Sequence, residues 1–206
     1  MNLPIRQSAN EMAAILRRRI CFSKGTENEK LHEGTLAVEF GVSRTPIRQV
    51  LQRLAYERLI EVRSGVGSVM VPLSEDRREQ EHKVACAMLN AAAECAQEEA
   101  ISASLRLEVH SLGAAASVLR EGEEELFFET RAKLLEVLAK LIPDEILRDG
   151  FRSSYWRLIR WKMRAMGTSQ ELVEMQRLAQ MLSAATDAAE TGGVPDLLKV
   201  IAEAEA

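Results

Sequence analysis

The chain has 206 residues, of which 47% are hydrophobic and 28% are charged, and its net charge is −4. This length and composition are typical of a globular protein with two modest domains, each able to bury a core. No run of about 18 apolar residues is present, which excludes a membrane-spanning helix, and the N-terminus lacks an apolar signal core, so we expect a cytoplasmic protein. Three cysteines without a paired spacing indicate neither a disulfide nor a zinc site.

The net charge is divided unevenly along the chain. Residues 1–73 contain 11 Lys+Arg and 7 Asp+Glu, a balance of +4, whereas residues 74–206 contain 16 and 24, a balance of −8. A basic domain is the electrostatic footprint expected for binding to phosphates. The first third of the chain is therefore the candidate for contact with nucleic acid, and the acidic remainder argues against DNA wrapping over the whole surface.

A first helix is predicted from Ser8 to Phe22. Its apolar residues recur at helical spacing and are expected to face a core: Met12, Ile15, Leu16 and Ile20. The three consecutive arginines at positions 17–19 either contact phosphate or form a solvated face, and only phosphate contacts would add to affinity for DNA. A polar, glycine-containing loop is expected from Lys24 to Lys30.

The stretch from Gly34 to Leu59 has the pattern of a helix-turn-helix. A short helix is expected to end at Gly41, because glycine readily adopts the left-handed conformation of a helix C-cap. A second helix is expected to begin after Ser43, whose hydroxyl would accept a capping N–H, with Pro46 in the first turn. Its apolar residues follow the i, i+3, i+4, i+7 rule and predict a buried face: Ile47, Val50, Leu51 and Leu54.

The opposite face of this second helix carries the side chains expected to bind DNA. Arg44, Arg48 and Gln52 repeat every four residues, with Thr45 and Gln49 beside them. The two-pronged donor of arginine fits guanine edges and phosphates, and the free N–H groups at a helix start attract phosphate. The pattern therefore predicts a recognition helix.

Two β-rich runs follow, from Ile60 to Val62 and from Ser68 to Val71, and they flank a turn that contains Gly65 and Gly67. This arrangement predicts a β-hairpin. Because glycine lets the backbone approach a partner closely, the tip of the hairpin is suited to lie against a phosphate or the minor groove.

Residues 11–73 resemble the winged-helix domain of the GntR family of bacterial transcription regulators. The motifs that carry the resemblance are Leu36-Ala37, Phe40-Gly41-Val42, Ser43-Arg44-Thr45-Pro46-Ile47-Arg48, Val50-Leu51 with Leu54, and Gly65-Val66-Gly67-Ser68-Val69. The resemblance implies DNA contacts by Ser43, Arg44, Thr45, Arg48 and the wing glycines.

Two positions depart from the GntR pattern. Gly34 and Val66 stand where many members of the family carry an arginine. Both departures remove a positive contact, so the resemblance implies an operator preference and affinity that differ from those of better-matched members.

After a short linker at Pro72-Leu73-Ser74, helices are the only predicted elements. They are expected at Glu75 to Ala100, Ser102 to Arg120, Glu123 to Leu141, Asp144 to Met166, Ser169 to Glu190, and Pro195 to the end. The expected fold is therefore mainly α. It combines an N-terminal winged helix-turn-helix with a small β-hairpin wing, residues 1–73, and an all-α helical bundle, residues 74–206.

By domain order, helix count and Pro143, the second domain resembles the FCD class of effector-binding and dimerisation domains in FadR-like and VanR-like regulators. Many members of that class hold a divalent metal with one Asp and three His. The register set by Ala139 and Pro143 puts Glu129, Lys133 and about Gln176 at three of these positions, and the last helix contains no His. A protonated lysine cannot ligate a metal, so we expect no metal, and no other cofactor is indicated.

Two interpretations of the helix around Lys133 remain open. In one, Lys133 replaces the charge of the metal and binds an anionic effector, such as a small organic acid, with Arg152, Trp156 and Arg160. In the other, the Glu and Lys side chains at positions 129, 133, 136 and 140 form a solvated stripe of favourable ion pairs.

The sequence contains no catalytic constellation, neither a nucleophile with a plausible His partner nor a GxxxxGK loop. We therefore expect no enzyme but a homodimeric, sequence-specific transcription regulator, acting as a repressor on a palindromic operator in double-stranded DNA under the control of a small-molecule effector. One alternative is an architectural DNA-binding protein whose helical domain only dimerises. Another is a helical enzyme anchored to DNA.

Overall fold

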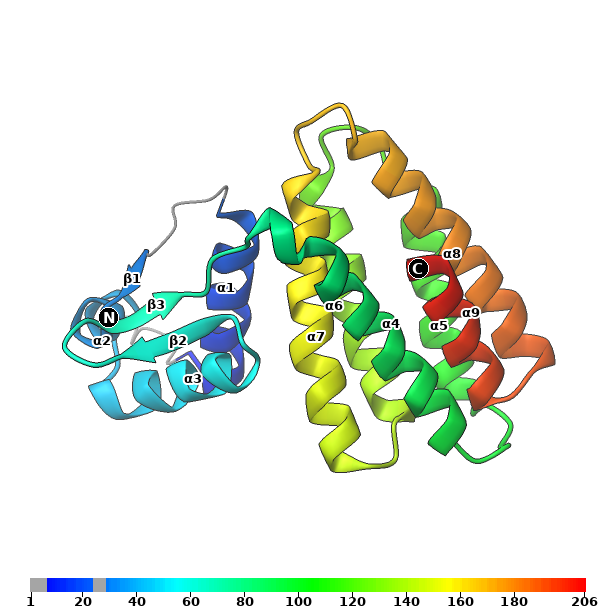
Figure 1. The fold of residues 1–206 in the computed structure, drawn as a ribbon, viewed down its shortest axis with the longest axis horizontal. Coiled ribbons are helices and arrows are strands. Elements are labelled where there is room, and N and C mark those ends of the chain that lie inside the picture. The colour runs from blue at the N-terminus through cyan, green and yellow to red at the C-terminus, as the bar shows by residue number, and fades with distance from the viewer. Residues whose placement is uncertain (1–6, 24–28) are drawn as a thin grey trace, which may run out of the picture. The chain divides into compact units, whose positions relative to one another are not determined.

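The computed structural model describes residues 7–23 and 29–206. The chain divides into two compact units, Met1–Ser74 and Glu75–Ala206, called here the N-terminal unit and the helical unit. Figure 1 labels the elements of each unit, which are described separately. Within the described residues, no helix is both long and apolar enough to cross a bilayer.

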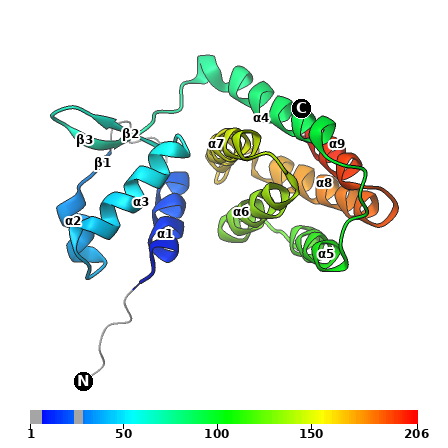
Figure 2. The ribbon, with the colours of Figure 1, turned by 90° about the horizontal axis from the view of Figure 1, so that it is seen from below.

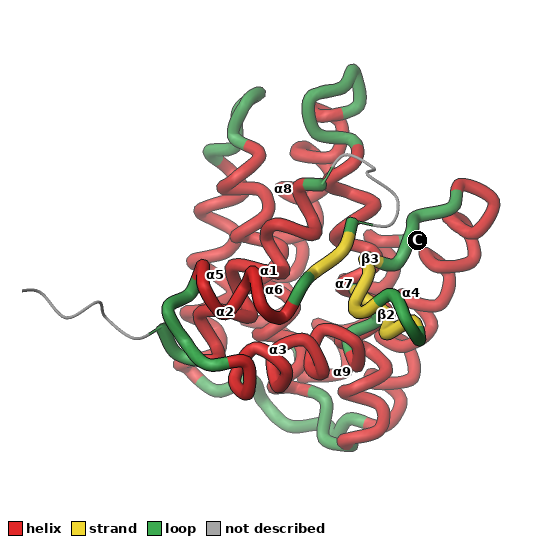
Figure 3. The backbone as a smooth tube through the Cα atoms, turned by 90° about the vertical axis from the view of Figure 1, so that its left-hand side faces the viewer, coloured by secondary structure: helices red, strands yellow, loops and turns green. Residues whose placement is uncertain are grey.

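In its described residues, the N-terminal unit is a small fold of three helices and a three-stranded antiparallel sheet (Figure 3). Its helices are α1 (Ala9–Phe22), α2 (Glu33–Glu39) and α3 (Arg44–Tyr56), and its strands are β1 (Lys30–Leu31), β2 (Ile60–Arg63) and β3 (Gly67–Met70). Helices α1 and α2 both pack on α3, and β3 lies between β1 and β2. The winged helix-turn-helix predicted from the sequence is confirmed.

Helix α1 begins with a capping box. The backbone N–H of Glu11 donates to the Ser8 hydroxyl at 3.2 Å, and the Glu11 carboxylate accepts the Ser8 N–H at 2.6 Å. These two bonds satisfy N–H groups that have no partner inside the helix. The helix therefore starts where the sequence predicted.

Two of the three arginines in the run on α1 pair with carboxylates of the helix-turn-helix. Arg17 is buried, and its guanidinium donates to both carboxylate oxygens of Glu57, at 2.5 and 2.7 Å. Arg19 pairs with Glu39 on α2. Arg17 and Arg19 bind α1 to the helix-turn-helix through carboxylate partners that neither sequence interpretation considered, whereas Arg18 is exposed.

Strand β1 was not predicted. Of the loop expected from Lys24 to Lys30, residues 24–28 lie outside the described residues, and Lys30 begins β1. Lys30 pairs with Val69, and Leu31 pairs with Ser68. A strand of two residues is too short to show an alternating pattern, yet it joins the hairpin to the segment that precedes α2.

The helical unit contains a short 3₁₀ turn and six α-helices. They are η1 (Glu75–Arg77), α4 (Arg78–Cys95), α5 (Ala103–Ser117), α6 (Glu124–Leu141), α7 (Glu145–Arg164), α8 (Glu171–Thr191) and α9 (Val194–Glu205). The first predicted helix, Glu75 to Ala100, is too long at both ends. Its start is the 3₁₀ turn, and Ala100 is extended because it forms an antiparallel bridge with Gly193.

The six helices form a closed ring in which each packs on two neighbours, in the order α4, α9, α8, α5, α6, α7 and back to α4. Figure 2 shows α4 and α9 side by side, with α5, α6 and α7 seen almost end-on. The interior is filled by large buried side chains, including Phe127, Leu134, Phe151, Leu158 and Leu182. The all-helical fold expected for this part of the chain is confirmed.

Candidate nucleic-acid interface

The turn before α3 is built around Gly41. Its φ of +63° lies in the left-handed region, where residues with a Cβ are strained. The N–H of Val42 then donates to the Ala37 carbonyl at 3.0 Å, which closes the end of α2. The sharp turn predicted at this glycine is therefore present, and it determines where the recognition helix begins.

Ser43 occupies the N-cap position of α3, but its side chain accepts no capping hydrogen bond. The sequence prediction was wrong on this point, and Pro46 provides the reason. Ser43 is followed by three helical residues, of which the third is Pro46, so the N–H that an N-cap hydroxyl often accepts is missing. Ser43 is exposed to solvent.

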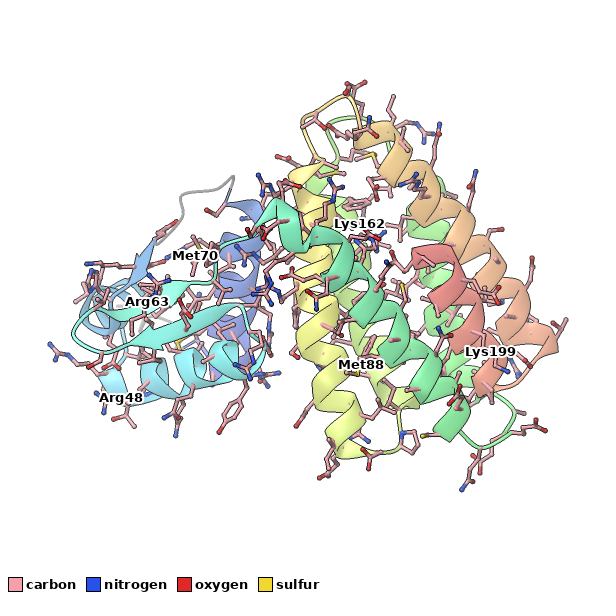
Figure 4. All side chains as sticks on the ribbon, viewed as in Figure 1. Arg48, Arg63, Met70, Met88, Lys162 and Lys199 are labelled. Atoms are coloured by element: carbon pink, nitrogen blue, oxygen red, sulfur yellow. The ribbon has the colours of Figure 1, made fainter. Side chains whose placement is uncertain are left out.

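Helix α3 has one buried face and one exposed face, as its sequence predicted. The apolar residues Ile47, Val50, Leu51 and Leu54 are all buried. The predicted DNA-contacting side chains on the helix are all exposed: Arg44, Thr45, Arg48, Gln49 and Gln52. Figure 4 labels Arg48 on the outer side of the N-terminal unit. The helix therefore presents arginine and amide side chains along one surface.

The guanidinium of Arg48 is held by a carboxylate from the preceding helix. Its Nε and Nη2 donate to the two oxygens of Glu33, at 3.1 and 2.8 Å. This pairing raises the pKa of Arg48 and lowers the pKa of Glu33, chiefly through the hydrogen bonds. Sequence analysis missed Glu33, because no local spacing relates residue 33 to residue 48.

Arg44 lies across the first turn of α2. A Cβ at Gly34 would be 3.6 Å from Arg44 Nη2, an ordinary van der Waals contact, so the guanidinium lies directly over this glycine. The two guanidinium groups on the exposed face of α3 thus both lie beside α2, one over Gly34 and one paired with Glu33. This places fork-shaped donors at the start of the recognition helix, where a helix also attracts phosphate.

The hairpin of β2 and β3 forms the wing. Arg63 pairs with Gly67 in the last register position, and the Val66 N–H donates to the Arg63 carbonyl at 3.1 Å. Gly65 and Gly67 have φ values of +72° and +99°, and a Cβ at either would meet no atom within 4 Å. The tip is therefore open, with bare backbone that a phosphate can approach.

The four side chains expected to bind an effector lie in different environments. Lys133 is exposed on α6, whereas Trp156 and Arg160 are buried on α7. Arg152 donates to both oxygens of Glu136, each at 2.7 Å. The stripe of Glu-to-Lys pairs expected along α6 is incomplete, because Lys140 donates to Glu108 on α5.

The register inferred from Ala139 and Pro143 was wrong. Glu129, Lys133 and Gln176, which it placed on inward faces, are all exposed. The polar residues that α6 and α8 bury near the centre of the ring include Arg131 and Glu174 instead.

A buried charge network occupies the interior of the ring. The Arg131 Nη1 donates to Glu205 Oε1 at 2.5 Å, and the Tyr155 hydroxyl donates to the same oxygen at 2.9 Å. Lys162 Nζ lies 3.0 Å from Glu174 and 3.7 Å from Glu205. Figure 4 labels Lys162 within the helical unit. Two cations and two carboxylates from α6, α7, α8 and α9 thus balance one another.

The network keeps its carboxylates ionised. Burial raises the pKa of Glu205, but the charges of Arg131 and Lys162 and the hydrogen bonds outweigh it, so the pKa is lowered. The pKa of Glu174 is lowered in the same way, mainly by Lys162 against burial. Burial and the charge of Glu205 raise the pKa of Tyr155 well above its ordinary value, so its hydroxyl stays a donor.

These residues do not fit a divalent metal. The interior presents Arg131 and Lys162, whose positive charges repel a cation. Across the described residues, no three His, Cys, Asp or Glu side chains lie together as a group that could hold a metal ion. The charge network therefore occupies the ring without a metal-binding donor set.

The sequence contained a signal for part of this network. Arg131 follows Phe127 by four residues and precedes Leu134 and Leu135 by three and four, so it falls inside the apolar stripe of α6. Glu205 similarly follows Ile201 by four residues on α9. A charge at a core position predicts a buried partner.

Residues 8–70 match the sequence model of bacterial regulatory proteins of the gntR family. A comparison with curated proteins returned no match.

Two solved structures resemble the whole chain. One, Escherichia coli McbR/YncC, is 14% identical, with 96% of this chain and 92% of that chain covered, at a TM-score of 0.63. Another, a putative GntR transcriptional regulator from Rhodococcus sp. RHA1, is 21% identical, with 95% and 93% covered, at a TM-score of 0.55. At these identities the likeness shows the two-part fold alone. Residues 8–70 form a DNA-binding domain of the gntR family of bacterial regulatory proteins.

Proposed function

We propose that the chain is a homodimeric repressor that binds a palindromic operator in the cytoplasm and releases it in response to a small anionic effector. The observation that carries this proposal is the exposed face of α3 with Arg44 and Arg48, which belongs to the same fold unit as a wing whose tip is open. Residues 1–73 carry a net charge of +4, so this part of the chain is better suited to bind DNA phosphates than the acidic residues 74–206.

The proposed division of labour follows from chemistry. Side chains in the middle of the exposed face read base edges in the major groove: Arg48, Gln49 and Gln52. Residues at the start of α3 contact the phosphates that flank these bases: Ser43, Arg44 and Thr45. Gly65 and Gly67 let the wing lie against the backbone or the minor groove.

The palindrome follows from symmetry. A two-fold dimer presents two copies of α3, so its preferred site repeats in opposite orientation at a separation that the dimer geometry determines. The helical unit supplies the dimer contact and the effector response in this proposal.

The test captures fragmented genomic DNA from the source organism with the purified full-length protein at moderate salt, and sequences the fragments that stay bound. We expect a small number of sites that share a short palindrome. Recovery of DNA without any shared motif would instead favour the architectural interpretation, because non-specific binding is mostly electrostatic.

A further inference from the structure

The helical unit has a cavity of about 670 Å³ along η1 and the first half of α4. Its lining includes Arg78, His82, Cys86, Ala87 and Asn90, which follow one another at helical spacing on one side of α4, together with Ala206 at the end of the chain. This volume lies within the range of pockets that hold small organic molecules. None of the four residues expected from the sequence to bind an effector lines it.

Of the two cationic side chains that line the cavity, one has N–H groups that donate no hydrogen bond to the described residues. Lys83 donates to Glu79 at 2.6 Å, so that pair is satisfied. Arg78 lies 3.8 Å from Glu75, beyond hydrogen-bond distance, and it donates no hydrogen bond within the described residues. An arginine guanidinium binds carboxylates with two parallel hydrogen bonds. Arg78 therefore fits a carboxylate that enters the cavity.

The remaining lining favours a single negative charge on the ligand. The two cationic and two acidic side chains of the lining balance, and the side chains of His82 and Cys86 are neutral at neutral pH. Burial and the nearby Lys162 lower the pKa of His82, and burial raises the pKa of the Cys86 thiol. A second anionic group would meet no further open cation among the lining residues.

The shape of the cavity favours an elongated, apolar ligand body. Arg78 and Asn90 are twelve residues apart on α4, which corresponds to about 18 Å along a helix. Between them, Cys86 and Ala87 present small side chains and His82 adds a polar ring, while the exposed Glu79 and Lys83 pair with each other. A chain of several methylene groups can lie along this surface with its carboxylate at Arg78.

We propose that this cavity binds an elongated monocarboxylate, with Arg78 as the group that receives the carboxylate. The assignment rests on the proposed effector control, for which it supplies a site. Glu75 pairs with Arg78 and directly follows the linker to the N-terminal unit. A ligand carboxylate that takes over Arg78 removes one arginine partner of Glu75, which keeps Arg164 at 3.5 Å, and so changes the contacts of η1, where the linker enters the helical unit.

Octanoate is the probe for the first measurement, by isothermal titration calorimetry with the full-length protein. Octanamide tests the need for the negative charge, and butyrate tests the need for length. We expect octanoate to bind saturably, octanamide to bind at least about tenfold more weakly, and each buried methylene between butyrate and octanoate to add about threefold to fourfold in affinity. Octanamide binding equal to octanoate would overturn the role of Arg78.

Two variants locate the binding. Arg78→Gln removes the guanidinium, and Ala87→Leu fills the cavity from an exposed helical position where leucine is a good helix former. Each should weaken octanoate binding by about tenfold or more, since a tenfold loss corresponds to one lost charged contact of modest strength. Arg77→Gln is the matched control, because Arg77 is the next residue but does not line the cavity, and it should leave binding unchanged.

Trp161 reports on the same site. The Arg78 guanidinium lies 5.6 Å from the centre of the Trp161 ring, so displacement of Arg78 should change the emission of this tryptophan. Octanoate should shift the fluorescence of a Trp156→Phe variant, in which Trp161 is the remaining tryptophan. Absence of saturable octanoate binding up to about 10 mM, or wild-type binding by both cavity variants, would overturn the site.

Operator binding in the presence of octanoate separates the site from the proposed function. If octanoate binds at Arg78 but leaves affinity for DNA unchanged, the cavity is a ligand site and control of DNA binding through it fails. If an effector releases the DNA equally from Arg78→Gln and from the wild type, effector control stands and this site is wrong. A change of oligomeric state in Ala87→Leu, measured by sedimentation, would show a second copy of the chain to be the occupant.

Discussion

The guanidinium of Arg48 is already oriented by Glu33 before DNA binds, at 2.8 Å between Nη2 and the carboxylate. Such pairing reduces the side-chain entropy that is lost when the arginine binds a base. Arg48→Ala should therefore weaken binding to the captured operator by about 1–3 kcal/mol and relax selectivity at one base position. Titrations of the operator and of single-base variants at several salt concentrations measure both effects.

Arg53→Ala is the control for this experiment. Arg53 lies on the same helix, but it donates to Asn10 at 2.8 Å and lies 3.4 Å from Glu57, within the N-terminal unit. Its loss should leave base selectivity intact. An Arg48→Ala protein that kept the same ranking of operator variants, with only a smaller salt slope, would assign Arg48 to a phosphate.

His32 limits the stability of α2. It occupies the N-cap position but makes no side-chain cap hydrogen bond. A serine hydroxyl at an N-cap accepts an otherwise unpaired N–H of the first turn. His32→Ser should therefore stabilise the N-terminal unit by about 0.5–1.5 kcal/mol, measured by urea denaturation. His32→Ala, which removes the ring without adding an acceptor, should give no such gain, and an equal gain from both variants would contradict the capping argument.

Among the elements, the charge network joins four helices of the ring, and Glu205 on α9 is its most connected carboxylate. Glu205→Gln keeps an acceptor for Arg131 and Tyr155 but removes the charge that balances Arg131. Loss of one member of a buried ion pair costs about 3–5 kcal/mol. We expect the free energy of unfolding of the helical unit to fall by this amount. Urea denaturation monitored by far-ultraviolet circular dichroism measures it.

The double variant Glu205→Gln with Arg131→Met tests the origin of that loss. It removes one positive and one negative charge, and it leaves Lys162 paired with Glu174. Most of the stability should return, because a buried pair replaced by apolar groups is often neutral. A double variant as unstable as the single one would assign the cost to packing rather than to charge.

The elements themselves were largely predictable. The turn-forming residues between the helices located every α-helix of the helical unit, and the glycines at positions 41, 65 and 67 located the turns of the winged helix, since left-handed backbone favours glycine. Strand β1 was not predictable from a two-residue pattern. The expected cap at Ser43 failed because Pro46 removes a donor, a conflict visible in the sequence but not weighed.

Distant pairings were the part that the sequence did not provide. Glu33 with Arg48, Arg17 with Glu57 and the network around Glu205 all join residues that are far apart in the chain. Periodicity indicates which face of a helix is buried, but it does not indicate which helix lies opposite. The cavity beside α4 was not predicted for the same reason, because its presence depends on which helices pack together in the ring.

For the molecule as a whole, stability should depend on pH through groups of the helical unit. His82 has a pKa below its ordinary value of 6.5, because burial and Lys162 and Arg78 outweigh the opposing charges of Glu205 and Glu174. The unfolded chain therefore takes up this proton first as pH falls. Stability is complete above about pH 6.5 and declines below it, until His82 is protonated in the folded state as well.

A second decline is expected at lower pH. The pKa values of Glu174 and Glu205 are below their ordinary 4.5, so their stabilising charge is complete above that value and is lost as pH falls through the folded pKa values. Urea denaturation between about pH 3 and 8 should show two separate declines. His82→Gln should remove the upper one alone, and an unchanged profile in that variant would contradict the assignment.

The balance of two cations and two carboxylates inside the ring also constrains how such a protein can change over generations. Any one-codon replacement that neutralises a member leaves its partner uncompensated in a dry interior, at a cost comparable to a large part of the stability of a domain. Conversion of this interior into an apolar core, or into a metal-binding one, therefore requires paired replacements or a prior reserve of stability gained elsewhere. Single substitutions in the charge network are therefore expected to be selected against. Changes in ligand response are expected first among residues outside the network, such as those that line the cavity beside α4.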